Sequence, residues 1–194
     1  MSLDLPERFR AVFFRQAQEP DTCEPLKTAS LSEQLGEWTK ALTVSVVAAC
    51  HEIGLRASAK AHALELLPIH RSEYLALDVT AFAPGEKRWL FPSVVMELEN
   101  SPREDQIAYS LWKVLCVRAD LRVVFCYRKQ APAIPALIQH LRTEVVDAMD
   151  LGGRVKLDGR TLVVVGSRSD ATTFPFGFFS WWELETNTGR FVKF

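Results

Sequence analysis

Three carboxylates near the ends of two strand-like segments are the residues of this chain whose types and spacing best suit chemistry. Asp78 lies within LALDVTAF, and Glu97 and Glu99 lie within VVMELEN. Side chains alternate in direction along a strand, so Glu97 and Glu99 point to one side, where Asp78 from a neighbouring strand can join them. Such oxygen ligands suit hard cations such as Mg²⁺ or Mn²⁺. The spacing therefore predicts a metal site formed by Asp78, Glu97 and Glu99.

Each of these acids also has an ordinary structural explanation. An aspartate on a strand usually faces solvent or caps a turn, and a Glu-x-Glu pair on an edge strand usually guards that edge against aggregation. Asp78, however, stands inside an otherwise apolar segment. A buried carboxylate is costly unless it is paired or binds a metal ion, so its surroundings favour the metal site.

The elements that must position these acids follow from hydrophobic periodicity and turn residues. Ser30 or Ser32 can cap the first expected helix, and Pro84-Gly85 marks a hairpin turn between the two acid-bearing strands. In chain order we expect a helix (31–54), two strands (73–82 and 89–99), a helix (105–118), a strand (121–127), a helix (134–149), a strand (161–166) and an aromatic edge strand or hairpin (174–185 with 190–194). This order predicts an α/β fold with a mixed central β-sheet flanked by helices on both faces.

The chain is long enough for one substantial core. It has 194 residues, of which 48% are hydrophobic. Residues 1–30 carry three prolines and several polar residues, so we expect an irregular N-terminal arm in which Phe9 to Phe14 can make one short docked turn. Residues 31–194 are expected to form a single α/β domain.

Composition excludes several classes of protein. No apolar run reaches the roughly 20 residues needed to span a bilayer, and the first residues lack the features of a secretory signal, so we expect a soluble, cytoplasmic protein without a membrane partner. The cysteines and histidines show no zinc-type spacing, and no glycine-rich nucleotide loop is present. The formal net charge of −1 gives no overall attraction for nucleic acid, although a local basic face or a bound metal ion can provide one.

The order helix, Asp-bearing strand, hairpin, Glu-x-Glu strand, helix, strand resembles the PD-(D/E)XK phosphodiesterase superfamily, which has a restriction endonuclease-like core. The resemblance covers about residues 31–128, and the 19 positions between Asp78 and Glu97 suit a hairpin. It implies that Asp78 and Glu97 bind the metal ion. In that family a lysine normally follows two positions after the glutamate and helps to orient or activate the attacking water.

Glu99 departs from this pattern because it occupies the place of the lysine. Some restriction enzymes of the superfamily also have Glu-x-Glu there, so Glu99 can hold metal or position water. A second possibility is that the lysine has migrated to Lys113, which lies with Gln106 and Tyr109 on one side of the following helix. A plain solvated helix face is the more common role for such a set.

The resemblance leads to two hypotheses. In the first, the chain is a Mg²⁺-dependent nuclease that hydrolyses DNA, with Asp78, Glu97, Glu99 and Lys113 as its catalytic set. In the second, it is a catalytically decayed member of the fold that serves as a binding or assembly module. The aromatic residues of segment 174–182 could stack on bases, but core packing or the interface of a homodimer suits their alternation better.

Overall fold

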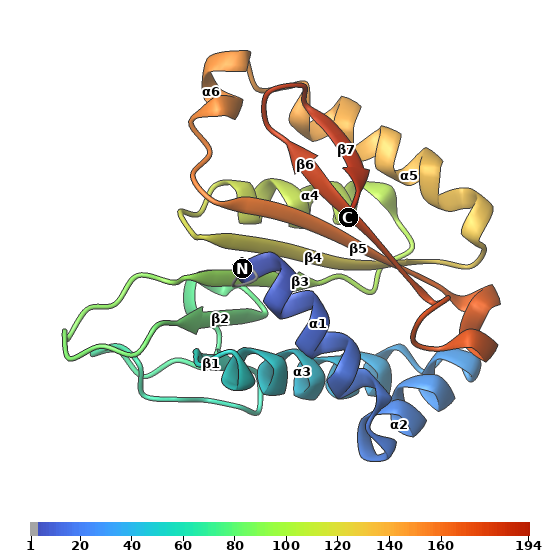
Figure 1. Ribbon diagram of the computed structural model, residues 1–194, viewed down its shortest axis with the longest axis horizontal. Helices are drawn as coiled ribbons and strands as arrows, with labels where there is room; N and C mark the ends of the chain where they lie inside the picture. Colours follow the sequence, from blue (N-terminus) through green and yellow to red (C-terminus); the bar gives the residue numbers. More distant parts are fainter. Residues whose placement is uncertain (1–3) are drawn as a thin grey trace.

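A seven-stranded mixed sheet, whose strands lie side by side in chain order, divides the molecule into two helical layers (Figure 1). The structure is a computed structural model that describes residues 4–194. The strands are β1 (Arg56–Ala59), β2 (Val79–Phe82), β3 (Val94–Leu98), β4 (Leu121–Arg128), β5 (Arg160–Ser167), β6 (Phe179–Glu185) and β7 (Arg190–Lys193). Strands β3, β4 and β5 are parallel to one another, and every other neighbouring pair is antiparallel. The predicted α/β class with a mixed sheet is thus confirmed.

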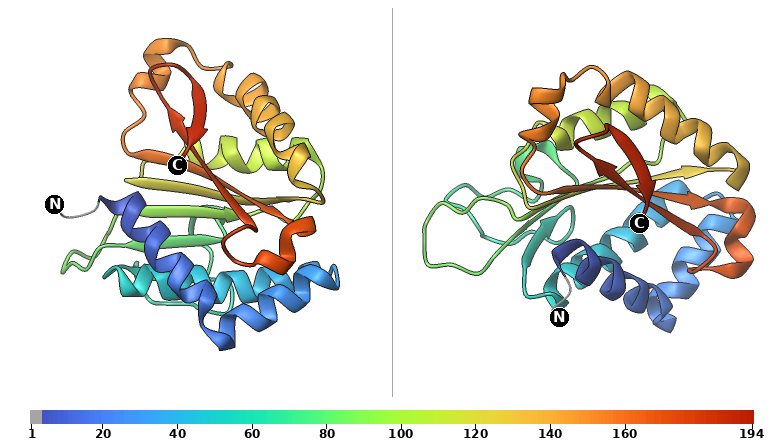
Figure 2. Two further views of the ribbon diagram at one scale, coloured as in Figure 1. Left: turned by 45° about the vertical axis from the view of Figure 1, so that its right-hand side comes forward. Right: turned by 45° about the horizontal axis from the view of Figure 1, so that its top comes forward.

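The helices form one layer on each face of the sheet (Figures 1 and 2). On one face lie α1 (Leu5–Gln18) and α3 (Leu35–Glu52), with α2 (Pro20–Leu31) packed against α3. On the other face lie α4 (Glu104–Leu115) and α5 (Ile134–Leu141), and α5 continues into a π-helical stretch (Arg142–Val146). The remaining short elements are α6 (Leu151–Val155) and the 3-10 segments Tyr74–Ala76, Ala131–Ala133 and Arg168–Thr173.

The expectation of an irregular N-terminal arm was wrong for the described part of the chain; residues 1–3 lie outside it. Helices α1 and α2 occupy most of residues 5–31. Pro6 and Pro20 do not interrupt them, because they stand in the first turns, where the backbone N–H makes no hydrogen bond within the helix. Asp4 and Glu7 form a capping box at the start of α1. Phe9 and Phe13 are fully buried, so α1 belongs to the core.

Several boundaries also differ from the sequence expectation. Strand β1 was not expected, and helix α3 begins at Leu35 without a capping serine. The strand expected from residue 73 begins only at Val79, because residues 74–76 form a turn.

The aromatic tail forms the expected hairpin, from β6 and β7. Phe178 and Trp181 are both buried, whereas Phe176 is 66% exposed and precedes the strand. The three therefore do not alternate along one strand as expected.

Each face of the sheet has its own core. Beneath α1 and α3 the core is rich in aromatic rings, including Phe9, Phe13, Phe125, Phe179 and Trp181. Beneath α4 and α5 it is mainly aliphatic, with Val95, Ile107, Leu111 and Val124 among its members. Within residues 4–194, no helix has the length and apolar character required to cross a membrane.

Candidate functional site

Strands β2 and β3 bring Asp78 and Glu97 together. Val79 of β2 pairs with Met96 of β3 in antiparallel register, and extending that register by one residue places Asp78 opposite Glu97. The amide N–H of Asp78 donates to Oε1 of Glu97 at 3.4 Å, and Oδ2 of Asp78 accepts a 2.7 Å hydrogen bond from the amide of Leu98. The two acids are therefore held side by side by the backbone of the sheet.

Glu97 points toward the α4 face of the sheet and meets a lysine there. Only 5% of the residue is exposed, and its Oε2 lies 2.9 Å from Nζ of Lys113. Lys113 comes from the last turn of α4, and its ammonium also donates to the carbonyl oxygen of Ala76 at 2.8 Å. Lys113 is therefore part of a charged cluster and not a plain solvated helix residue.

Burial raises the pKa of Glu97 from the ordinary value of 4.5 to about 7. The hydrogen bond from Lys113 opposes this rise, whereas the nearby charge of Asp78 adds to it. A carboxyl group that titrates near neutral pH can accept or release a proton under ordinary conditions. Such perturbed groups gather at functional sites, although structural ion pairs show them too.

Glu99 lies on the same side as Glu97, where the hydroxyl of Ser110 contacts both carboxylates, but its oxygens bind protein groups. Its Oε1 accepts a 2.7 Å hydrogen bond from the amide of Ser101, and its Oε2 accepts one of 3.1 Å from the hydroxyl of Ser110. Among residues 4–194, no three His, Cys, Asp or Glu side chains are arranged to hold one metal ion. The expected convergence of Asp78, Glu97 and Glu99 on a single ion is therefore not observed.

The pair of Asp78 and Glu97 nevertheless has donor chemistry that fits a divalent cation. Among the described residues, Oδ1 of Asp78 has no hydrogen-bond partner, and Oε1 of Glu97 accepts only the long bond from the amide of Asp78. Mg²⁺ keeps several waters and needs only one or two carboxylates from the protein when phosphate supplies further oxygens. These two oxygens are thus the ones available for such an ion.

A strained turn leads directly into Asp78. Leu75 and Ala76 have φ of 59° and 54°, a left-handed conformation that residues other than glycine seldom adopt. The turn is held on one side by Tyr74, which is buried and whose hydroxyl donates to the carbonyls of Leu64 and Ile69. On the other side it is held by Lys113 through the carbonyl of Ala76. Lys113 therefore connects the approach to Asp78 with the carboxylate of Glu97.

The other residues proposed on α4 have smaller roles in this cluster. Tyr109 is 54% exposed, with its ring centroid 5.8 Å from Nζ of Lys113, and Gln106 is half-buried. Among the hydrogen bonds of residues 4–194, none joins either side chain to the acids. The sequence analysis missed Ser110, which is buried and donates to Glu99. Its signal was the spacing of Gln106, Ser110 and Lys113, which places all three on one side of a helix.

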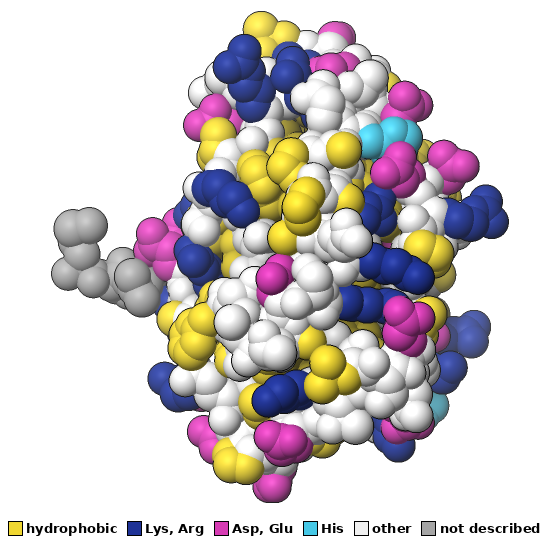
Figure 3. All heavy atoms as spheres, turned by 90° about the vertical axis from the view of Figure 1, so that its right-hand side faces the viewer, with side chains coloured by type: hydrophobic (Ala, Val, Ile, Leu, Met, Phe, Trp, Pro, Cys, Tyr) yellow, Lys and Arg dark blue, Asp and Glu magenta, His cyan; other side chains and the backbone are white. Residues whose placement is uncertain are grey.

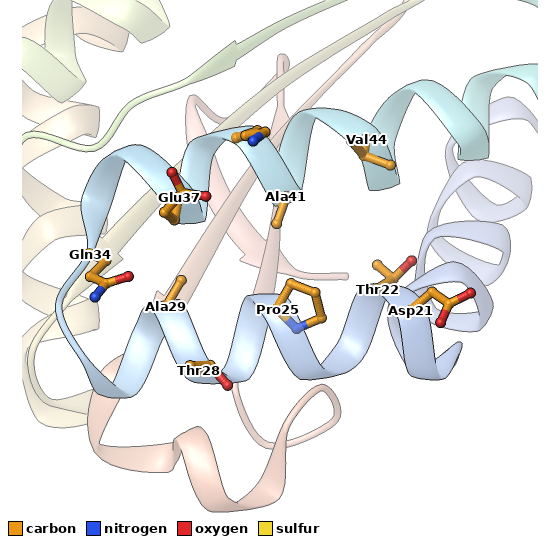
Figure 4. A pocket seen from close by; sticks show the side chains of 10 residues that line it. Asp21, Thr22, Pro25, Thr28, Ala29, Gln34, Glu37, Ala41 and Val44 are labelled. Carbon is orange, nitrogen blue, oxygen red and sulfur yellow. The ribbon is translucent and has the colours of Figure 1, made fainter.

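Two pockets lie around α3. A pocket of about 380 Å³ extends from α3 to Asp78, and its walls include Lys40, Lys60, His62 and Glu73. A second pocket, of about 410 Å³, separates α2 from α3. Figure 4 shows Pro25 and Ala29 of α2 facing Ala41 and Val44 of α3 across it. The first pocket adjoins a candidate site residue, whereas the second is centred on apolar side chains.

The surface shows no large area of one charge on the face drawn in Figure 3, where basic and acidic side chains lie interspersed. A scan against protein-family models gives no match, and a comparison with curated proteins gives none either. Functional inference therefore depends on the geometry of Asp78, Glu97 and Lys113.

Proposed function

We propose that this chain is a metal-dependent phosphodiesterase that hydrolyses DNA, with a restriction endonuclease-like core. The observation that carries the proposal is the adjacency of Asp78, Glu97 and Lys113, the last with its ammonium 2.9 Å from the carboxylate of Glu97. The element order α3, β2, β3, α4, β4 agrees with the order in the PD-(D/E)XK resemblance, with Asp78 just before β2, Glu97 on β3 and Lys113 on α4. The additional strand β1 pairs with the outer side of β2 and leaves this order unchanged.

In this proposal Asp78 and Glu97 hold the divalent ion, Mg²⁺ or Mn²⁺. When bound, the ion supplies a Lewis acid for the phosphate and lowers the pKa of an attacking water. Lys113 supplies a positive charge beside the reacting phosphate, where negative charge grows in the transition state. Glu99 positions Ser110 and the loop that begins α4, so it supports the site without binding the ion. Water adds to phosphorus, the bond to the leaving oxygen breaks, and that oxygen takes up a proton.

A second candidate function is a non-catalytic binding or assembly module of the same fold. Its supporting observation is that each acid already has a protein partner: Glu97 has Lys113, Asp78 has the amide of Leu98, and Glu99 has Ser101 and Ser110. A polar cluster with its own partners is stable without an ion.

Metal binding and DNA cleavage by the whole chain separate these two functions. We expect millimolar Mg²⁺ or Mn²⁺ to raise the melting temperature of the wild-type protein and to bind saturably in calorimetry. Asp78→Asn should lose both effects, whereas Asp105→Asn, at an exposed position in the first turn of α4, should retain them. Metal-dependent nicking of plasmid DNA should fall by about 100-fold or more in Lys113→Ala. If no metal binds and the wild-type protein does not cleave DNA, the enzyme proposal fails and the module remains.

A further inference from the structure

The pocket between α3 and Asp78 has a cationic wall that the site described so far does not use. Lys40 of α3 and Lys60 and His62 after β1 line it, with Glu73 and Asp78 as its acidic members. None of the ion pairs formed by residues 4–194 includes Lys40, Lys60 or His62. The ammonium groups of Lys40 and Lys60 and the imidazole of His62 are therefore available to a ligand.

A tight turn fixes the part of this wall that comes from β1. The amide of His62 donates to the carbonyl of Ala59 at 2.9 Å, and the amide of Ala59 donates to the carbonyl of His62 at 3.3 Å. Ala61 has φ of 62°, a left-handed conformation that is strained for alanine and that persists at sites where the surroundings impose it. Lys60 and His62 are thus presented by a constrained turn and not by a free loop.

Helix α3 contributes the remaining part of the cationic lining. Gly36 and Lys40 line the pocket from its first two turns, and no side chain caps this end of the helix. A Cβ added at Gly36 would meet no atom within 4 Å, so the pocket is open there. The positive end of the helix dipole adds to the charge of Lys40 and favours an anion near this turn.

We propose that this pocket binds a phosphate group of a nucleic-acid strand through Lys40 and Lys60, beside the position at which Asp78 acts. An isolated lysine ammonium suits a phosphate as a point charge, and His62 adds a further donor. The acidic lining residues Glu73 and Asp78 disfavour a second anion, so the pocket accepts one phosphate between its two lysines. That this phosphate neighbours the one to be hydrolysed rests on the proposed function; the binding itself does not.

Binding of a fluorescently labelled single-stranded oligodeoxynucleotide to the whole chain, measured by anisotropy in the presence of EDTA, tests the proposal. We expect Lys40→Ala/Lys60→Ala to weaken binding roughly tenfold and to reduce the slope of log K against log salt by about 0.7, the value for one lost phosphate contact on a single strand. The matched control is Lys87→Ala/Lys156→Ala, two exposed lysines that precede the amino ends of the parallel strands β3 and β5, away from the pocket. It should keep wild-type affinity, and both variants should keep the wild-type melting temperature because all four lysines are exposed.

The outcomes distinguish this inference from the proposed function. An equal loss of affinity in both double variants would show diffuse attraction and overturn the pocket. A second arm uses inorganic phosphate as competitor: displacement of the oligonucleotide only at high phosphate supports a strand, whereas lysine-dependent binding of phosphate without any binding of the oligonucleotide overturns it. Lysine-dependent strand binding by a protein that never cleaves would sustain the inference and refute the hydrolysis. Cleavage by the wild-type protein, together with unchanged strand affinity in Lys40→Ala/Lys60→Ala, would support the hydrolysis and overturn the inference about the pocket.

Discussion

The two faces of the sheet pack against different kinds of side chain. Beneath α1 and α3, aromatic rings pack on one another. The ring centroid of Phe13, for example, lies 5.2 to 5.6 Å from those of Phe125, Phe179 and Trp181. Beneath α4 and α5 the packing is aliphatic, and the buried Glu97 meets Ser110 and Lys113 at its margin. The buried polar contacts of the aromatic face join neutral groups, such as the hydrogen bond from Trp38 to Tyr127, whereas the aliphatic face carries the buried acid Glu97.

This difference indicates how stability and chemistry are divided in the chain. Large rings bury much apolar area and make the α1 face a source of folding free energy. A buried acid and its lysine partner contribute little net stability, because their loss of hydration offsets their attraction. Changes on the aromatic face should therefore affect folding, and changes at the charged margin should affect pH response and activity.

The largest effect is expected from Phe13→Ala on the aromatic face. Phe13 is fully buried, so its truncation should leave a cavity and lower the free energy of unfolding by about 3–5 kcal/mol. Urea unfolding followed by tryptophan fluorescence measures this. Phe176→Ala is the control, because Phe176 is 66% exposed and stacks only on Phe14, so it should cost less than about 1 kcal/mol. Equal losses of unfolding free energy in the two variants would refute the view that the aromatic core under α1 is a main source of stability.

The next effect concerns the pH dependence of stability in metal-free protein. The pKa of Glu97 is raised in the folded state from 4.5 to about 7, so the folded state binds this proton more tightly than the unfolded state. Its stabilisation is fully present below pH 4.5 and is lost as the pH rises through about 7. The free energy of unfolding should therefore fall by about 3 kcal/mol across this window.

Glu97→Gln should remove that fall, and urea unfolding at a series of pH values in EDTA measures it. The exposed Glu86→Gln should leave the wild-type profile unchanged. A Glu97→Gln protein with the same pH profile as the wild type would show that Glu97 is not the titrating group.

A smaller effect is expected from Lys113→Met, which keeps most of the aliphatic stem and removes the charge. Near pH 8 the loss of a charged hydrogen bond to Glu97 should cost about 2 kcal/mol, and near pH 5 it should cost less because Glu97 is then protonated. The pKa of Glu97 should rise above that of the wild type, since the lysine opposes the effect of burial. A titration of the side-chain carboxyl by NMR checks this; a lowered pKa would mean that the ion pair does not form.

The smallest effect should come from Ala76→Gly in the turn before Asp78. Glycine adopts the left-handed φ of 54° without steric cost, so relief of strain should offset its greater entropy in the unfolded chain. We expect a change within about 1 kcal/mol, in the stabilising direction. Thermal unfolding measures it, with Ala63→Gly in the neighbouring exposed loop as the control. Destabilisation larger than in that control would show that the turn is not strained.

The parts of the fold that the sequence predicted are those with strong periodicity. The long apolar runs of β4 and β5 and the stripe of α4 leave little choice of structure, so these elements were expected at nearly their observed positions. Helices α1 and α2 were missed because prolines suggested interruption, although two of the three stand in first turns. Strand β1, with the sequence RASA, has no β-branched or aromatic residue, and its pairing with β2 alone makes it a strand.

The positions of site residues could be predicted where the direction of the backbone determines them. They could not be predicted where a side chain has several possible hydrogen-bond partners. Strand alternation predicted that Glu97 and Glu99 share one side, and the hydroxyl of Ser110 contacts both, but it could not show that Ser101 and Ser110 would bind the oxygens of Glu99. The contact of Lys113 with Glu97 was one of two alternatives, because helical spacing gives a direction and not the reach of a flexible stem. The sequence thus predicts which side of a strand or helix a residue faces, whereas its hydrogen-bond partner depends on tertiary packing.

The packing of α1 against β6 also has a consequence for how the protein is made. Asp4 at the start of α1 pairs with Arg160, 156 positions later, and Phe13 packs on rings of β6. During synthesis α1 can meet α3 and Phe125 of β4 early, but its contacts with Phe179 and Trp181 must wait until β6 leaves the ribosome, and such non-local contacts form slowly. The nascent chain should therefore keep part of the aromatic surface of α1 exposed until β6 has been synthesised.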